Sequence, residues 1–210
     1  MKQMLSAIIM FAAVAFTACN NNTVANEHEG HDMHTPAKDT TQHAAAPDEK
    51  ELKTITAVFT NVDTKAAATI KEIVDHYLHI KNALVNDNAG DAADGAKAME
   101  KALAKMDQSL FTAEQKTAYD ATEEALKEHA AHISKNGDNI KHQRSHFAMM
   151  SEEVYTLVKN FGAGRALYHD HCPMARDNKG ALWVSEIKEV KNPYFGAQML
   201  TCGTIEEVIQ

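Results

Sequence analysis

The stretch from Ile140 to Gly162 reads IKHQRSHFAMMSEEVYTLVKNFG, and it decides the fold that we expect. Its large apolar residues recur every three or four positions, a spacing that places them on one face of an α-helix. A glycine directly after the last of them is a common end signal for a helix. The residues on this face are Ile140, Phe147, Met150, Val154, Leu157, Val158 and Phe161.

Three earlier segments carry the same rhythm. One begins near residue 64, the second lies between Gly90 and Leu110, and the third begins at Thr112. Thr112 and Gln115 have the spacing of a capping box, and Asn136-Gly137 marks a turn before the last helix. Four helices with short connections predict an all-α fold, an antiparallel four-helix bundle. Its apolar positions are Ile70, Ile73, Val74, Tyr77, Leu84, Val85, Ala92, Ala96, Met99, Leu103, Met106, Leu110, Tyr119, Leu126, Ala130 and Ile133.

The N-terminus has the features of an export signal. Lys2 precedes a short apolar run, and small residues lead up to Cys19. This arrangement resembles a bacterial lipobox, which implies cleavage before Cys19 and attachment of lipid to that cysteine. An ordinary signal peptide with an incidental cysteine is the alternative. We therefore expect residues 1–18 to be a signal peptide and the mature protein to be anchored to a bacterial membrane through Cys19.

Residues 19–50 are expected to form a disordered tether, because they contain almost no large apolar side chain. His28, His31 and His34 in this segment fit either loose metal binding or a polar spacer. Residues 51–210 then form the folded domain. The full chain has a formal net charge of −8, which becomes −9 when residues 1–18 and their single Lys2 are removed. This acidity argues against nucleic acid as a partner.

Beyond Gly164 the pattern changes to turns rich in Gly, Pro and Asn. At most, short strands are expected near residues 182–184 and 204–208, and residues 52–62 fit either a strand or a helical turn. We expect this C-terminal segment to pack on the helices through aromatic anchors. The anchors are Trp183, Tyr194 and Phe195.

Two polar turns in the C-terminal segment gather the remaining sulfur and several imidazoles. One turn carries Cys172 and Met174 on either side of Pro173, and the other carries Met199 and Cys202. Thiolate and thioether are the soft ligands that select Cu(I), whereas a zinc site would leave the methionines unexplained. If the two turns meet, four sulfur atoms converge. The candidate ligands are Cys172, Met174, Met199 and Cys202, with His171 or His169 as an optional imidazole.

A disulfide explains the same two cysteines. In an oxidising compartment Cys172 and Cys202 could pair and close a loop of about thirty residues, worth about 3–4 kcal/mol. Met174 and Met199 would then be ordinary core residues. The spacing leaves both explanations open.

Six histidines lie in pairs at helical spacing. They are His76 with His79, His129 with His132, and His142 with His146. Each pair could hold one ion, and facing helices could share a site. Their helical phase favours exposed or boundary positions instead, with at most weak metal binding. For Gln143, Arg144 and Ser151 we expect structural roles, such as holding the C-terminal segment on the helices.

The motifs of this chain resemble a periplasmic domain family that is catalogued without an assigned function. That family occurs as stand-alone lipoproteins and at the C-terminus of membrane-fusion adaptors of heavy-metal efflux pumps. The resemblance covers most of residues 64–210. It rests on Tyr77-Leu78, Lys81-Asn82-Ala83-Leu84, Gln143-Arg144, Phe147, Ser151, Leu167-Tyr168, Cys172-Pro173-Met174-Ala175, Trp183-Val184-Ser185, Asn192-Pro193-Tyr194, Gly196, Met199-Leu200 and Cys202-Gly203.

The resemblance implies a helical-bundle domain associated with copper or silver. We therefore expect a periplasmic protein, anchored to the outer membrane, that binds Cu(I) or Ag(I) and buffers it or delivers it to an efflux system. A disulfide-stapled interaction module without metal is the alternative. We do not expect an enzyme, because no oxyanion-hole, phosphate-binding or dinucleotide motif accompanies the cysteines and histidines.

Overall fold

The computed structural model describes residues 52–210, which lie within one compact unit of the chain. The expected signal peptide, the lipid-bearing Cys19 and the expected tether fall outside the described residues. Within residues 52–210, no helix combines the length and the apolar character that crossing a membrane requires.

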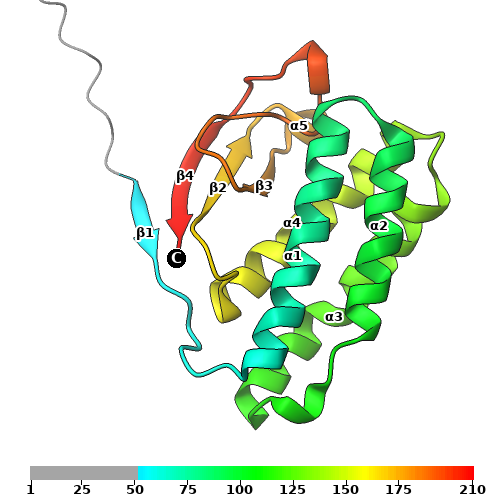
Figure 1. The fold of residues 1–210 in the computed structure, drawn as a ribbon. Coiled ribbons are helices and arrows are strands. Elements are labelled where there is room, and N and C mark those ends of the chain that lie inside the picture. The colour runs from blue at the N-terminus through cyan, green and yellow to red at the C-terminus, as the bar shows by residue number, and fades with distance from the viewer. Residues whose placement is uncertain (1–51) are drawn as a thin grey trace, which may run out of the picture. The chain divides into compact units, whose positions relative to one another are not determined.

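The four long helices expected from the sequence are present. They are α1 (Thr64–Val85), α2 (Ala89–Ala104), α3 (Ala113–Lys135) and α4 (Ile140–Phe161). Each packs against the next, and α4 also contacts α1 (Figure 1). α2 ends earlier than predicted, and Leu110 belongs to a short 3₁₀-helix, η1 (Gln108–Leu110).

Local signals set the helix ends as predicted. The Gln115 amide N–H donates to Thr112 Oγ1 at 3.2 Å, and the Thr112 amide donates to Gln115 Oε1 at 3.1 Å, which completes the capping box at the start of α3. Gly162 ends α4 with a φ of +70°, a conformation that glycine adopts without strain. Local sequence signals therefore predict where α3 begins and where α4 ends.

The predicted apolar faces form the core between the helices. From Phe147 to Phe161 every predicted position of α4 is buried, whereas Ile140 at its start is only partly buried. Tyr77 of α1 stacks on Phe147 with ring centroids 5.0 Å apart. Burying side chains of this size contributes about 1.5–3 kcal/mol each, so this core is the main source of stability.

The prediction of an all-α fold is confirmed only in part: the four long helices pack together, but a four-stranded sheet lies beside them. Its strands are β1 (Lys53–Ile55), β2 (Leu167–Cys172), β3 (Ala181–Ser185) and β4 (Thr204–Ile209), in the order β1-β4-β2-β3. β1 runs parallel to β4, while β2 is antiparallel to both β3 and β4. The short strands expected near residues 182–184 and 204–208 are confirmed, and the ambiguous segment at residues 52–62 contains β1.

β2 is the element that the sequence pattern missed. His169, Asp170 and His171 interrupt any apolar alternation, so residues 168–175 were expected to form a turn. In the fold, β3 and β4 supply hydrogen-bonding partners on both sides of these residues. Strand formation depends strongly on such tertiary context, and here the context overrides the local pattern.

Polar contacts inside the core join the sheet to the helices. Tyr77 Oη lies 2.8 Å from Ser151 Oγ and accepts a hydrogen bond from the Val184 amide at 3.0 Å. The Tyr194 hydroxyl donates to the Leu182 carbonyl. Trp183 and Tyr194 are buried as expected, and Phe195 is partly buried against the core. The aromatic anchors therefore position the C-terminal segment.

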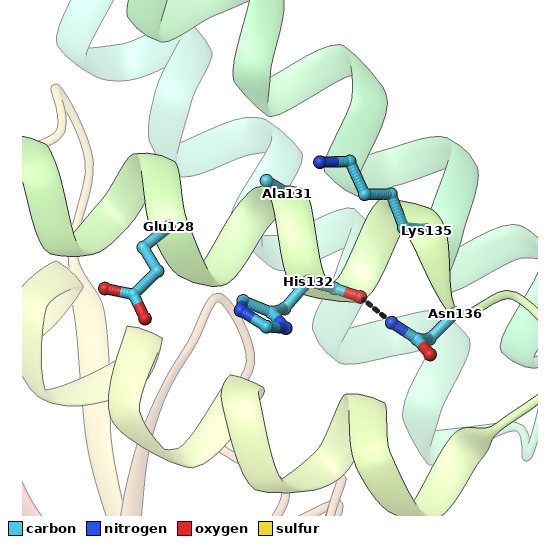
Figure 2. A pocket seen from close by; sticks show the side chains of 5 residues that line it. All are labelled: Glu128, Ala131, His132, Lys135 and Asn136. Atoms are coloured by element: carbon cyan, nitrogen blue, oxygen red, sulfur yellow. Dashed lines mark hydrogen bonds between the residues drawn. The ribbon is translucent and has the colours of Figure 1, made fainter.

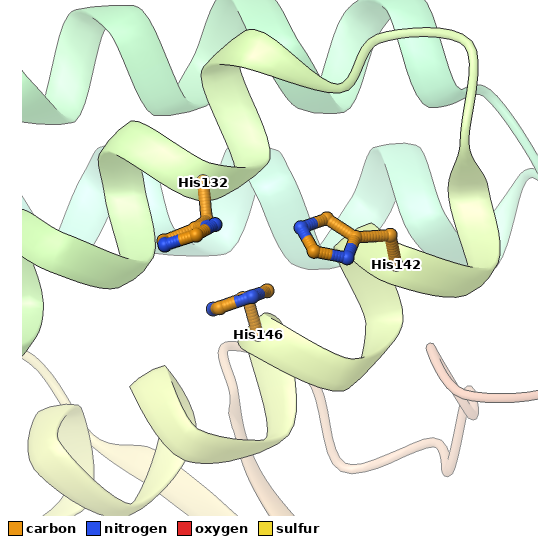
Figure 3. A group of neighbouring side chains, drawn as sticks. All are labelled: His132, His142 and His146. Atoms are coloured by element: carbon orange, nitrogen blue, oxygen red, sulfur yellow. The ribbon is translucent and has the colours of Figure 1, made fainter.

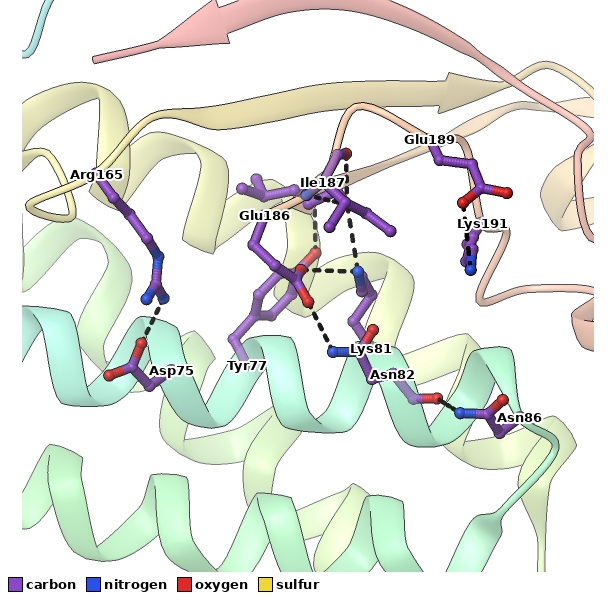
Figure 4. A network of polar contacts seen from close by, with 12 residues as sticks. Asp75, Tyr77, Lys81, Asn82, Asn86, Arg165, Glu186, Ile187, Glu189 and Lys191 are labelled. Carbon is purple, nitrogen blue, oxygen red and sulfur yellow. Dashed lines mark hydrogen bonds and ion pairs between the residues drawn. The ribbon is translucent and has the colours of Figure 1, made fainter.

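An ionic contact also joins α1 to the segment that follows β3, and we call it the Lys81–Glu186 seam (Figure 4). Lys81 is fully buried, and its Nζ lies 2.8 Å from Glu186 Oε2 and 3.2 Å from Ser185 Oγ. Asn82 Nδ2 donates to Glu186 Oε1 at 2.8 Å. Because a buried ammonium requires such partners, this cluster fixes where the end of β3 meets α1.

Candidate functional site

The structure brings the two cysteines of the C-terminal segment together. Cys172 ends β2, Cys202 lies in the turn before β4, and their Sγ atoms are 2.8 Å apart. Both are free thiols; Cys172 is fully buried and Cys202 is partly exposed. Their shared hydrogen bond raises the pKa of Cys202 to about 11. The Cys202 thiol is therefore protonated at neutral pH.

The turn that carries Cys202 is held by one buried side chain and one glycine. Asn192 Nδ2 donates to the Cys202 carbonyl at 2.6 Å, and the Asn192 amide donates to the Leu200 carbonyl at 2.8 Å. Gly203 has a φ of +145°, and a Cβ there would lie 2.7 Å from Cη2 of Trp183. Only glycine fits this approach, so Gly203 helps to place Cys202 against β2.

The two methionines lie on the same two turns as the thiols. Met174 is 47% exposed and precedes α5 (Ala175–Asn178), whose last three residues have φ between +53° and +64°. Met199 follows the 3₁₀-helix η2 (Gly196–Gln198) and is partly buried; its carbonyl accepts from the Cys202 amide at 3.1 Å. Both thioethers are thus within two or three residues of a thiol along the chain.

The two candidate histidines of β2 lie elsewhere. Strand alternation puts His169 and His171 on the opposite face of β2 from Cys172. His169 Nδ1 lies 3.7 Å from Glu207 Oε2, and His171 Nδ1 lies 3.5 Å from Glu206 Oε1. Burial lowers the pKa of His169. The rings are grouped with carboxylates rather than with the sulfur atoms.

Asp170 shares the inner face of β2 with Cys172. It is fully buried, and burial raises its pKa to about 8, although the nearby Lys81 ammonium opposes this shift. Burial thus disfavours the charged form of Asp170 beside the thiol pair.

The structural roles expected for three polar residues of α4 are confirmed. Gln143 donates to the carbonyls of Ala89 and Ile133 at 2.9 and 3.1 Å. The Ser151 hydroxyl donates to the Phe147 carbonyl at 2.8 Å.

Arg144 is the residue of α4 that holds the C-terminal segment. It donates to the Pro193 carbonyl at 2.8 Å and pairs with Asp87 at 2.6 Å. Many residues in the motifs that carry the family resemblance therefore hold the parts of the fold together.

A second candidate site is one that the sequence raised but that helical phase disfavoured. His132 of α3 and His142 and His146 of α4 face one another between the two helices (Figure 3). Within residues 52–210 they form the one group of three or more His, Cys, Asp or Glu side chains whose ligand atoms all lie within 4.8 Å of one another. Their partly buried positions agree with the boundary placement that the phase predicted.

The signal that would have favoured a shared site is the symmetry of the two histidine pairs. His129 with His132 and His142 with His146 stand at similar distances on either side of the turn at residues 136–139. Side chains that lie off the core stripe of each helix can still meet at the flank where two neighbouring helices touch. The angular position of each histidine relative to the buried face of its own helix does not reveal that the side chains meet.

The fold is that of a small, mostly helical protein with an appended four-stranded sheet. Among its described residues, three histidines are grouped closely enough to hold a metal ion. Residues 73–166 match the model of a family described as a protein of unknown function, DUF3347. The match covers most of α1 and all of α2, α3 and α4, and it ends before β2. The histidine cluster lies inside the matched region and the thiol pair outside it. No curated protein and no solved structure matches the chain.

Proposed function

We propose that this protein binds a soft monovalent metal ion, Cu(I) or Ag(I), through Cys172 and Cys202, and that it buffers the ion or delivers it to an efflux system. The observation that carries this proposal is the 2.8 Å separation of two thiols that are 30 residues apart in the chain. Thiolates are strong ligands for such ions, and two of them suffice for a first attachment. The role is one of binding, not of catalysis.

The chemistry of loading follows from the state of the pair. The metal binds thiolates, so it must displace the thiol protons, including the one that the two sulfurs share. Two sulfur ligands at about 2.3 Å from one ion would stand about 3.8 Å apart at a tetrahedral angle and about 4.6 Å apart in a linear arrangement, so the pair must open by about 1–2 Å. The turn that carries the partly exposed Cys202 can supply this movement. Met174 or Met199 would add a neutral thioether ligand.

The cellular setting of the proposal comes from the sequence. A lipid on Cys19 would hold the domain at the periplasmic side of a bacterial membrane, within reach of an efflux adaptor. The short connections between consecutive helices support an antiparallel order of α1–α4. A partly exposed ligand set suits transfer of an ion between proteins, because a partner ligand can reach the ion before the first ligand leaves.

A disulfide-stapled module is the second candidate, and the same distance favours it. A separation of 2.8 Å is closer to a disulfide bond, at about 2.05 Å, than to two ligands of one ion. Oxidation of the two thiols by a protein disulfide oxidant would form the S–S bond and pass two electrons and two protons to the oxidant's disulfide, which would become two thiols. The staple would join the end of β2 to the start of β4.

Competition titration with a Cu(I) chelator tests the main proposal on the reduced protein. Cys172→Ser and Cys202→Ser should each weaken Cu(I) binding by at least about 100-fold, and Met199→Leu by about tenfold. Arg176→Ala, an exposed change on the neighbouring turn, is the matched control and should leave the affinity unchanged. Equal affinity in both serine variants and the parent would refute the thiol site.

The mass of the purified, non-reduced protein separates the two candidates. A deficit of two daltons that persists in the periplasmic fraction indicates the staple. Full-mass protein that carries copper supports the metal site. For the anchor, Cys19→Ser should release the protein from membranes, and continued membrane partitioning would contradict lipid attachment at that residue.

A further inference from the structure

The flank between α3 and α4 gathers four imidazoles close to one turn of the chain. His132, His142 and His146 have ligand nitrogens within 4.8 Å of one another, and the His129 and His146 Nδ1 atoms are 3.2 Å apart. Figure 3 shows the ring of His132 reaching from α3 toward the two rings of α4. The turn at residues 136–139 joins the two helices directly, so this arrangement depends on a short piece of chain.

Three imidazoles are ligands that suit a borderline divalent ion. Neutral imidazole suits Zn²⁺ and Cu²⁺, and three histidines with an open fourth position are a known zinc arrangement. Nitrogens bound at about 2.1 Å around one tetrahedral ion stand about 3.4 Å apart. The observed spread of 4.8 Å can therefore close through side-chain rotation, without movement of either helix.

The rings themselves show what must rotate. His132 and His146 are stacked with centroids 4.0 Å apart and planes 5° from parallel. Parallel stacked rings direct their in-plane nitrogens past a common point, so one ring must turn when an ion binds. Nε2 of His142 is buried and has no hydrogen-bond partner. An ion ligated by this nitrogen would supply the missing partner.

Two rings at this flank are partly withdrawn from water. Burial, and then the neighbouring histidines, lower the pKa of His146 to about 4. Burial likewise lowers the pKa of His129.

A surface hollow gives access to His132. It has a volume of about 150 Å³ and is lined by Glu128, Ala131, His132, Lys135 and Asn136 (Figure 2). This space is large enough for water to reach the His132 side chain. Glu128 adds a negative charge that also acts on His129 and His146.

We propose that His132, His142 and His146 form a second metal site, which binds one Zn²⁺ or Cu²⁺ ion independently of the thiol pair. The site differs from the proposed Cu(I) site in ligand type, in the preferred ion and in its place in the fold. Its ligands come from two consecutive helices, whereas the thiol pair requires the sheet.

Calorimetric titration with Zn²⁺ alone tests this proposal on a parent chain freed of competing ligands. The parent carries Cys172→Ser and Cys202→Ser, together with glutamine at His28, His31, His34 and His43. It should bind one Zn²⁺ per chain and gain thermal stability as Zn²⁺ is added. His132→Gln, His142→Gln and His146→Gln should each weaken binding by about 100-fold or more.

Two controls keep the outcome decisive. His76→Gln and His79→Gln alter the other helical pair, on α1, and should leave Zn²⁺ binding unchanged. The melting temperature without metal shows whether a variant remains folded, and NMR of the His132, His142 and His146 ring protons in the parent reports the loss of stacking on binding. Unchanged affinity in the three cluster variants, or unshifted ring signals at saturating Zn²⁺, would overturn the proposal. Because the parent lacks the thiols, neither result bears on Cu(I) binding.

Discussion

The histidine cluster and the thiol pair are assembled in opposite ways. The cluster joins His132 to His146 across one turn between consecutive helices, so local chain geometry brings its members together. The thiol pair joins Cys172 to Cys202 through the pairing of β2 with β3 and β4, and this sheet packs on α1 and α4 through β3. The histidine cluster therefore depends on one pair of consecutive helices, whereas the thiol pair depends on contacts between residues far apart in the chain.

The two sites also differ in how deeply their side chains are buried. Cys172 is fully buried at the inner face of the sheet, whereas His132, His142 and His146 are partly buried at the flank of two helices. Changes that loosen the sheet from the helices should therefore damage the thiol pair first. Such changes provide the sharpest tests of this difference.

Replacement of Lys81 by alanine should have the largest effect. Lys81 is fully buried against Glu186, and removing one partner of a buried ion pair costs about 3–5 kcal/mol. Urea unfolding measures the loss, and the rate at which a thiol reagent modifies Cys202 should rise. Lys97→Ala is the control, since its pair with Asp94 is exposed and should contribute little to stability. A loss for Lys81→Ala as small as that of the control would contradict a role for this seam.

Gly203→Ala should separate the two sites most cleanly. The added Cβ would approach Trp183 at 2.7 Å in a backbone conformation that favours glycine, so we expect a loss of about 2 kcal/mol and displacement of Cys202. Cu(I) affinity should fall while Zn²⁺ binding at the histidines remains.

Gly90→Ala is the matched control for Gly203→Ala. A Cβ at Gly90 meets only Asn88 Oδ1 at 3.7 Å, and alanine favours the helix. This change should be neutral or slightly stabilising. Equal Cu(I) affinity in Gly203→Ala and Gly90→Ala would show that the turn does not position the thiol.

The pH dependence of the seam gives a smaller effect. Burial alone raises the pKa of Glu186, but hydrogen bonds from Asn82 and Lys81 outweigh it and hold that pKa below its usual value. A carboxyl with a depressed folded pKa stabilises the fold above its unfolded pKa of about 4.3, and the gain disappears as the pH falls. Glu186→Gln should therefore cost about 1–2 kcal/mol at pH 7 and little near pH 3. Denaturant unfolding at both pH values measures this, and a cost independent of pH would contradict it.

Thr112→Ala should have the smallest effect and should spare both sites. It removes the capping box at the start of α3, which contributes about 1 kcal/mol and lies at the opposite end of that helix from His132. The melting temperature should drop by a few degrees, while Zn²⁺ and Cu(I) affinities stay at parent values. A selective loss of either ion would show that helix capping and that site are coupled.

The helices were predictable because their signals are local. Thr112 and Gln115 indicate the start of α3, and Gly162 indicates the end of α4. The spacing of Phe147, Val154 and Phe161 indicates a buried face without reference to the rest of the chain. β2 was not predictable in this way, because its hydrogen bonds belong to strands that arrive from residues 181–185 and 204–209.

The sequence by itself determined the four helices, their buried faces and the soft-donor character of the last forty residues. Only the tertiary structure decided that Cys172 and Cys202 meet, that His169 and His171 turn to the carboxylates of β4, and that His132 faces His142 and His146. The physical reason is that helical hydrogen bonds close within four residues, so a short stretch of sequence specifies them. Strand pairing and the meeting of side chains on different elements depend instead on the packing of distant residues.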